Sequence, residues 1–234
     1  MNQLRGSFQL EDAEIYQNNQ ASVQLESDKD SLKSFYAVKG KRILDVFLVV
    51  IGAPFVLPLM GLIALMIKLE GGSVIYRQKR IGLGGREFDF LKFRSMVPNA
   101  DQLLQKHLDD NPNFASEWET KQKLDDDPRV TKLGRFIRTT SLDELPQLWN
   151  VLIGDMSLVG PRPMLPEQQK MYPGKEYNLM KPGITGLWQV SERNDVGFSH
   201  RAIFDSDYSR KISLWFDLKI LVRTVGAVCN GTGC

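Results

Sequence analysis

The sequence has few of the residues that form disulfide frameworks or bind soft metals. Its only two cysteines, Cys229 and Cys234, lie within the last six of 234 residues, which excludes a disulfide framework elsewhere. The pair could be oxidised or palmitoylated, but we interpret residues 229–234 as an inert tail. The only histidines, His107 and His200, are far apart, so we do not expect a zinc site. Any metal should be a hard cation held by carboxylates and phosphates.

The chain also lacks an excess of charge of either sign. Its formal net charge is +2 at pH 7, so no general basic field indicates binding to nucleic acid. Residues 1–32 are polar and have no apolar core, so a secretory signal peptide is not expected. We expect residues 1–38 to form a polar, disordered arm.

A long apolar segment follows this arm. Residues 43–67 contain one charge, Asp45. About 20 apolar residues are enough to span a bilayer, so we expect residues 39–69 to be embedded in a membrane. Basic residues flank both ends, whereas the positive-inside rule predicts asymmetry for a spanning helix. The flanking residues are Lys33, Lys39, Lys41 and Arg42 before the segment and Lys68, Arg77, Lys79 and Arg80 after it.

Two prolines interrupt the apolar segment. Pro54 and Pro58 each remove a helical hydrogen bond, and in series they favour a sharp bend. A bent helix could enter and leave the membrane at one face. The alternative is a kinked helix that spans the bilayer, because proline is tolerated in membrane helices. The sequence leaves both topologies open.

Residues 70–228 have the mixed pattern of an α+β domain. Alternation in 73–80 and 88–93, around a glycine-rich turn, predicts a β-hairpin. Residues 99–123 and 130–150 favour helix. Apolar residues at helical spacing over 214–225 predict an amphipathic helix, which belongs either to the core or to the membrane interface.

The segment Ser141-Leu-Asp-Glu144 has the pattern of a helix-capping box, which by itself explains these residues without catalysis. Pro146 fits better if Asp143 is the cap, because proline is tolerated in the first turn. In both cases two carboxylates lie at a helix start. There the free amides and the helix dipole should keep Asp143 ionised, and they could also receive a phosphate.

Basic side chains accompany this acidic pair. Arg138 lies five residues before Asp143, and Arg162 follows in a Gly-Pro-Arg-Pro turn; arginine suits bidentate phosphate contacts. Lys92 and Arg94 would share one face of a strand, which is either solvated or an anion-binding surface. Mg²⁺ held by one carboxylate and substrate phosphates would complete the set. These features predict metal-assisted phosphate chemistry at a membrane.

Three segments together resemble one bacterial family. They are YRQKRIGLGGREFDFLKFRSM, DPRVTKLGRFIRTTSLDELPQLWNVLIGDMSLVGPRP and KPGITGLWQV. With the preceding apolar segment they are similar to bacterial sugar transferases, the monotopic polyprenyl-phosphate sugar-1-phosphate transferases, over roughly residues 40–228. The ending RTVGAVCNGTGC resembles exopolysaccharide-initiating galactosyl-phosphate transferases. The resemblance implies a mostly helical α+β protein with a re-entrant membrane helix, a small β-hairpin and interfacial amphipathic helices. It further implies a catalytic domain, residues 70–228, on the cytoplasmic face of the bacterial inner membrane.

The resemblance also implies a covalent mechanism. Asp143 would attack the β-phosphate of a UDP-sugar, UMP would leave, and undecaprenyl phosphate would then attack the aspartyl phosphosugar. Glu144 would bind Mg²⁺, while Lys92, Arg138 and Arg162 would contact phosphate. UDP-galactose is the expected donor and UDP-glucose the second choice. The other expected partners are the lipid bilayer and downstream membrane glycosyltransferases, and a homodimer is compatible with the resemblance.

Two positions depart from the family pattern. Ala53 stands where a serine usually precedes the bending proline, and Glu192 replaces a usual glycine. Larger members carry extra N-terminal transmembrane helices, so the chain resembles the minimal form. Two rival functions remain, a catalytically silent membrane-anchored binding module and a membrane metal-dependent phosphatase. The intact Asp143-Glu144 pair argues against the first, and the second would transfer to water rather than to lipid.

Overall fold

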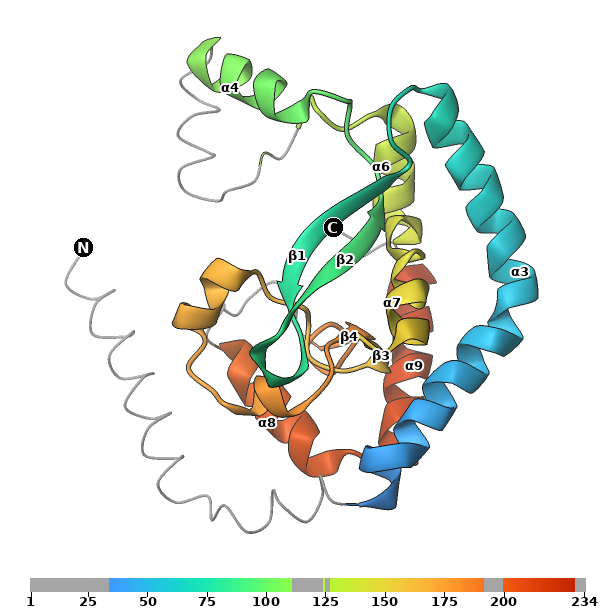
Figure 1. Ribbon diagram of the computed structural model, residues 1–234, viewed down its shortest axis with the longest axis vertical. Coiled ribbons are helices and arrows are strands. Elements are labelled where there is room, and N and C mark those ends of the chain that lie inside the picture. The colour runs from blue at the N-terminus through green and yellow to red at the C-terminus, as the bar shows by residue number, and fades with distance from the viewer. Residues whose placement is uncertain (1–33, 111–123, 125–126, 192–199, 230–234) are drawn as a thin grey trace, which may run out of the picture.

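The computed structural model describes residues 34–110, 124, 127–191 and 200–229. Helices predominate, and two small sheets lie among them (Figure 1). This confirms the predicted mixture of helices with a small β component. Residues 1–33, which include most of the expected arm, lie outside the described part of the chain, as do residues 230–234.

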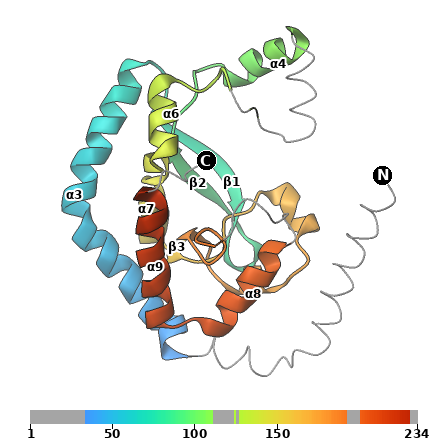
Figure 2. The ribbon, with the colours of Figure 1, turned by 180° about the vertical axis from the view of Figure 1, so that it is seen from behind.

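The apolar segment forms one long helix. A short π-helical turn, η1 (Tyr36–Gly40), continues into α3 (Lys41–Leu69). The helix is continuous through Pro54 and Pro58, and its axis changes direction clearly near its middle, so that its two halves run at an angle to each other (Figures 1 and 2), as the prolines favoured. It is long and apolar enough to cross a membrane, and only 11% of its most apolar window is buried.

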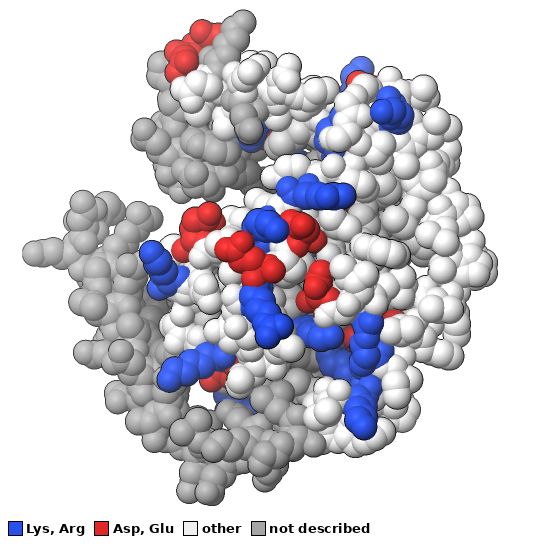
Figure 3. All heavy atoms as spheres, in the orientation of Figure 1, with Lys and Arg blue, Asp and Glu red and all other residues white. Residues whose placement is uncertain are grey.

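Both ends of α3 pack against the rest of the described chain, whereas its middle does not. Near the start, Arg42 donates to the carbonyls of Val151 and Leu152. Near the end, Ile63 and Ile67 are buried in a core cluster. Between these ends, large apolar side chains face outward, and Phe55 is 81% exposed. Figure 3 shows the corresponding edge of the molecule largely without charged side chains.

A β-hairpin carries Arg80 and Lys92. Strands β1 (Ile75–Ile81) and β2 (Glu87–Phe93) pair antiparallel. They are joined by the turn η2 (Leu83–Gly85), where Gly84 and Gly85 have positive φ angles of 70° and 76° that glycine adopts without strain. The predicted hairpin is therefore confirmed. Phe88 and Phe90 on its inner face are buried in a core cluster with Val49, Val151 and Met156.

The helical prediction for residues 130–150 is only partly right. After α4 (Ala100–Asp110) come α6 (Lys132–Thr139), the 3₁₀ turn η3 (Leu142–Glu144) and α7 (Gln147–Ile153). Ser141 separates α6 from η3, because its φ of 56° lies in the left-handed region, which few non-glycine residues adopt. Sequence periodicity detects each helical piece but not this single reversal of the backbone.

The C-terminal half completes the domain. Strands β3 (Ser157–Val159) and β4 (Gly183–Thr185) form a short parallel pair. The 3₁₀ turns η4 (Pro166–Met171) and η5 (Glu176–Leu179) lie between them in sequence. Helices α8 (Arg201–Lys211) and α9 (Leu214–Cys229) follow.

Helix α9, for which the sequence leaves core and membrane interface open, has one buried and one exposed side. Asp217 and Ile220 are buried, whereas Trp215 is 80% and Val222 73% exposed. One side of the helix therefore belongs to the core and the other presents apolar side chains outward. Helix α9 contacts β3 and β4, and it overlaps α7 in both ribbon views, behind it in Figure 1 and in front of it in Figure 2.

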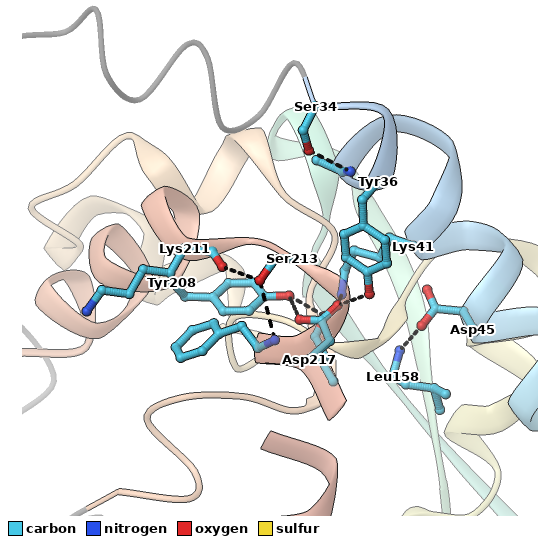
Figure 4. A network of polar contacts seen from close by, with 12 residues as sticks. Ser34, Tyr36, Lys41, Asp45, Leu158, Tyr208, Lys211, Ser213 and Asp217 are labelled. Carbon is cyan, nitrogen blue, oxygen red and sulfur yellow. Dashed lines mark hydrogen bonds and ion pairs between the residues drawn. The ribbon is translucent and has the colours of Figure 1, made fainter. Parts of the chain in front are cut away.

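A buried polar network joins the start of α3 to α8 and α9 (Figure 4). The Asp217 carboxylate is 1% exposed and accepts hydrogen bonds from Tyr36 Oη at 2.7 Å and Lys41 Nζ at 2.6 Å. It also accepts from Tyr208 Oη at 2.7 Å. Nearby, Asp45 accepts from the backbone amide of Leu158 at 3.0 Å. The charged groups of the membrane segment are thus used in its attachment to the domain.

Candidate active site

The acidic pair lies in the turn η3, between the end of α6 and the start of α7. Asp143 is 6% exposed. The expected capping box is absent, because Ser141 makes no side-chain capping bond and only its backbone carbonyl accepts from the Glu144 amide at 3.3 Å. Pro146 occupies the position just before α7. Asp143 and Glu144 therefore precede a helix, but not as its cap.

Lys92 approaches the acidic pair from the hairpin. Its Nζ lies 2.8 Å from Glu144 Oε1 and 3.4 Å from Asp143 Oδ2. It also lies 5.6 Å from the centre of the Phe90 ring. A lysine at the end of β2 thus compensates two carboxylates that are 51 and 52 residues away in sequence.

Burial governs the protonation of Asp143. Removal from water raises the pKa of the Asp143 carboxyl above its usual range, the charge of Lys92 opposes this shift, and Glu144 adds to it. The expectation that helix amides keep Asp143 ionised is therefore wrong about the dominant effect. The group that favours the ionised form is the Lys92 ammonium, with a smaller contribution from Arg138.

Arg138 reaches the same region from the last turn of α6. Its Nε donates to Ser95 Oγ at 2.7 Å, and its charge acts on Asp143. Helix α6 can approach Ser95 because residue 134 is glycine: a Cβ there would lie 1.9 Å from the Ser95 carbonyl oxygen. The close backbone contact sets the position of Arg138.

Arg162 and Arg94, the other predicted basic residues, lie elsewhere. Arg162 places its guanidinium 6.0 Å from the centre of the Trp188 ring, and Arg201 lies over the same ring at 4.3 Å. Arg94 donates to the carbonyl of Ile67 at the end of α3. Lys92 and Arg94 therefore do not share an anion-binding surface, because one serves the acidic pair and the other the membrane helix.

Arg80, Trp188 and Arg201 were not recognised as site residues from sequence. Arg80 lies opposite Phe88 in the hairpin, so the predicted hairpin, with its register, could have placed it on the same face as Lys92. Arg201 and Trp188 come together only through the tertiary fold, and no local pattern marks them. Glu192 and Cys234 lie outside the described residues, and the Cys229 side chain is not described.

The donor set of the acidic pair suits a hard cation only in part. No group of three histidine, cysteine or acidic side chains that could hold a metal occurs among the described residues. Mg²⁺ commonly uses one or two protein carboxylates together with substrate phosphates and water. Asp143 and Glu144 supply such carboxylate oxygens, so they fit a magnesium ion that arrives with a phosphorylated substrate.

A buried carboxylate beside Lys92 and Arg138, on a domain that carries a long apolar helix, suits group transfer at a membrane. The family model described as bacterial sugar transferase matches residues 36–231. The chain therefore belongs to the bacterial sugar transferase family, and the resemblance found in the sequence is confirmed.

Several relatives are similar to most of this chain. The chain is 49% identical over 179 residues to a UDP-galactose-lipid carrier transferase of Erwinia amylovora, covering 76% of this chain and 38% of that protein. It is 44% identical over 197 residues to the exopolysaccharide production protein ExoY of Sinorhizobium fredii, covering 83% and 87%. It is 47% identical over 195 residues to an undecaprenyl-phosphate galactose phosphotransferase of Salmonella typhimurium, covering 82% and 41%. The chain thus spans less than half the length of two of these relatives.

Proposed function

We propose that the protein transfers a sugar-1-phosphate from a UDP-sugar to undecaprenyl phosphate, as an initiating step of exopolysaccharide or related glycoconjugate synthesis. The observation that carries this proposal is the buried Asp143 carboxylate beside Lys92 and Arg138. Burial raises the pKa of Asp143, and a poorly solvated carboxylate is a stronger nucleophile than one in water. The names of the Erwinia and Salmonella relatives support the same transfer, and the name of the Sinorhizobium relative supports its place in exopolysaccharide production.

The reaction has two displacements. An Asp143 oxygen forms a bond to the β-phosphorus of the donor, the bond to the bridging oxygen breaks, and UMP leaves with that oxygen. A phosphate oxygen of the lipid then attacks the same phosphorus, and the bond to Asp143 breaks, which regenerates the carboxylate. Lys92 and Arg138 offset the negative charge of the transferred phosphoryl group. Glu144 would hold Mg²⁺, which would supply further neutralisation of phosphate charge.

The donor sugar is proposed as galactose, with glucose as the second candidate. The Erwinia and Salmonella relatives carry galactose in their names. A relative from Caulobacter vibrioides, 43% identical over 197 residues, is named as a glucose-1-phosphate transferase. An assay of UMP release across a panel of UDP-sugars should give UDP-galactose the highest kcat/KM. A higher value with an N-acetylated UDP-sugar would overturn this choice.

The membrane helix is proposed to be re-entrant. Arg42, in the first turn of α3, donates to the carbonyls of Val151 and Leu152, and Arg94, which follows β2, donates to the Ile67 carbonyl near the end of α3. Both ends of the helix are therefore attached to the domain. If the domain lies on one side of the bilayer, both helix ends must lie on that side too. Exposed apolar side chains on α6, α7 and α9, namely Phe136, Trp149, Ile153, Trp215 and Val222, would rest in the interface. We place this domain at the cytoplasmic face of the inner membrane.

Topology can be tested by single-cysteine labelling. Phe35 and Ser73 flank the membrane helix and are exposed, so cysteines at these positions, in a chain with Cys229 and Cys234 replaced by serine, should react with impermeant reagents from the same side. Labelling of residue 35 from the periplasm and residue 73 from the cytoplasm would instead identify a spanning helix.

Trapping the intermediate tests the activity directly. The protein, exposed to UDP-galactose and Mg²⁺ without lipid and then quenched, should carry one hexose phosphate on Asp143, located by peptide mass spectrometry. Addition of undecaprenyl phosphate should discharge the adduct into lipid. Discharge into water at the same rate would identify a phosphatase, and the absence of both adduct and UMP release would identify a silent binding module. Glu144→Gln should raise the Mg²⁺ concentration needed for half-maximal activity, since an amide oxygen is a poorer ligand for a hard cation.

A further inference from the structure

A second group of cations lies on the hairpin face that carries Lys92. In the antiparallel register Gln78 is opposite Phe90 and Arg80 is opposite Phe88. Side chains of directly opposite residues lie on the same face, so Arg80 and Lys92 share this face with both phenylalanines. Arg80 Cζ lies 5.3 Å from the centre of the Phe90 ring, and Lys92 Nζ lies 5.6 Å from it. The Phe90 ring therefore connects the surroundings of Arg80 with the acidic pair.

Two further guanidinium groups extend this group of cations. Arg162 and Arg201 both lie over the Trp188 ring. The charge of Arg162 acts on Arg80, and the charges of Arg162 and Arg80 act on Arg201. Burial, then the charge of Arg162, lowers the pKa of Arg80. Burial, then the charges of Arg162 and Arg80, lowers the pKa of Arg201 to about 10. Asp205 offsets part of this repulsion at Arg201, and a bound anion would offset the charges of the three partly buried guanidinium groups further.

The same place contains buried hydrogen-bond donors without acceptors. Within the described part of the chain, Arg80 Nε and Trp188 Nε1 are buried and have no partner. Arg80 uses its other nitrogens for the Pro163 carbonyl, at 3.1 Å, and for Gln78 Oε1, at 2.8 Å. A buried donor without an acceptor costs about 1–3 kcal/mol. A phosphate, which offers only acceptor oxygens, would satisfy these donors and the like charges together.

We propose that Arg80, Arg162, Arg201 and Trp188 form a phosphate-monoester subsite that the two half-reactions use in turn. It would hold the α-phosphate of the donor, which becomes the phosphate of UMP, and afterwards the phosphate of the lipid acceptor. This inference rests on the proposed two-step transfer.

The chemistry of displacement at phosphorus explains the double use. The attacking and leaving oxygens lie roughly in line at the transferred phosphoryl group. Asp143 is the attacking group in the first step and the leaving group in the second. The lipid phosphate must therefore approach from the side on which UMP left. Both species end in a phosphate monoester, so one set of cations can receive each of them after the other has gone.

The test compares charge-removing variants in both half-reactions. Exchange of labelled UMP into UDP-galactose, measured without lipid, reports the first half-reaction. Full turnover reports the KM for undecaprenyl phosphate. In Arg80→Gln and in Arg201→Gln, the UMP concentration that gives half-maximal exchange and the KM for undecaprenyl phosphate should both rise at least about tenfold. This is the effect of losing one charge-assisted hydrogen bond. The matched control Arg77→Gln, at an exposed position of β1, should change neither value.

Further measurements separate lost phosphate binding from lost structure. Inhibition by uridine, which has no phosphate, should be unchanged in both variants; parallel weakening of uridine and UMP would overturn the subsite. Arg80→Lys and Arg201→Lys should recover part of the affinity. In the wild-type protein, which needs no variant to fold, UMP should compete with undecaprenyl phosphate, and mixed inhibition would overturn the shared use.

Failure of the subsite and failure of the function differ in outcome. If the wild-type protein exchanges UMP but Arg80→Gln and Arg201→Gln behave like Arg77→Gln, the subsite is wrong and the function stands. If only UMP binding weakens, the cations serve the donor alone, and the double use is wrong. If the wild-type protein exchanges no UMP into any UDP-sugar, the proposed function itself fails.

Discussion

Two buried carboxylates, each beside a lysine, have opposite arrangements. Asp217 accepts three hydrogen bonds at 2.6–2.7 Å, from Tyr36, Lys41 and Tyr208. Among the described residues Asp143 has one polar side-chain contact, Lys92 Nζ at 3.4 Å. The first carboxylate has its lone pairs occupied, whereas the second keeps most of them free.

This difference supports the proposal that Asp143 is the reacting carboxylate, and it gives Asp217 a structural role. A saturated carboxylate would have to lose strong charge-assisted bonds before its oxygen could attack anything. An unsaturated, buried carboxylate is costly to the folded state, as reactive groups often are. Burial alone does not distinguish the two, since Asp143 is 6% and Asp217 1% exposed.

Replacement of Asp143 should have the largest effect on activity. Asp143→Asn keeps size and polarity but removes the nucleophile, so transfer should fall by about a thousandfold or more. The free energy of unfolding should not decrease, because a neutral amide is less costly to bury. Turnover assays and denaturant unfolding of the same preparation check both parts. Transfer at wild-type rate in this variant would mean that the nucleophile is another residue.

Replacement of Asp217 should lower the free energy of unfolding and leave the chemical step intact. Asp217→Asn leaves the Lys41 ammonium, whose side chain is 14% exposed, without its counter-charge. Breaking such a buried pair typically costs about 3–5 kcal/mol. Urea unfolding of the protein in lipid nanodiscs should show a loss of this order, while adduct formation on Asp143 persists in the folded fraction. An unchanged unfolding midpoint would contradict the structural role.

The two lysines should also differ in their effect on pH dependence. Lys92 lowers the pKa of Asp143 and so opposes the effect of burial. Lys92→Gln should raise the pKa of Asp143 further, which leaves less of the nucleophile ionised at a given pH, and the acidic limb of the kcat/KM profile should move to higher pH. Lys41→Gln, the matched control in the Asp217 network, should leave that limb in place. Coincident limbs in the wild-type protein and Lys92→Gln would contradict this assignment.

The smallest effect is expected at an exposed ion pair. Lys79 and Asp89 lie 2.8 Å apart across the hairpin, with side chains 58% and 52% exposed. Exposed pairs contribute little to stability, because water and salt screen the two charges. Asp89→Asn should therefore change unfolding free energy far less than Asp217→Asn, although it removes an ion pair of similar length. A loss as large as that of Asp217→Asn would show that solvent exposure is not what separates the pairs.

Structural elements that are determined by residues close together in the chain could be predicted from the sequence. The apolar run of residues 43–67 gave the long helix, and alternation around Gly84 and Gly85 gave the hairpin. The positions of Asp143 and Glu144 beside a helix start also followed from local spacing. Each of these depends on neighbours within a few residues.

Features that depend on long-range packing could not be predicted in this way. The partner of Lys92 lies more than 50 residues away, and Arg201 meets Arg162 only over the Trp188 ring. Arg94 shares the alternating pattern of Lys92, yet it bonds to the end of α3. Periodicity gives the face of a strand, but it does not say what that face meets.

The left-handed backbone of Ser141 has a consequence for how the catalytic spacing is encoded. In an uninterrupted helix, residues five apart are rotated by about 140° around the axis, so Arg138 and Asp143 would point to nearly opposite sides. The reversal at Ser141, with φ 56° and ψ 17°, allows both to act at one place. The number of residues between Arg138 and Asp143 is thus part of the geometry of the proposed site, and an insertion or deletion there would separate the two groups while leaving every side chain present.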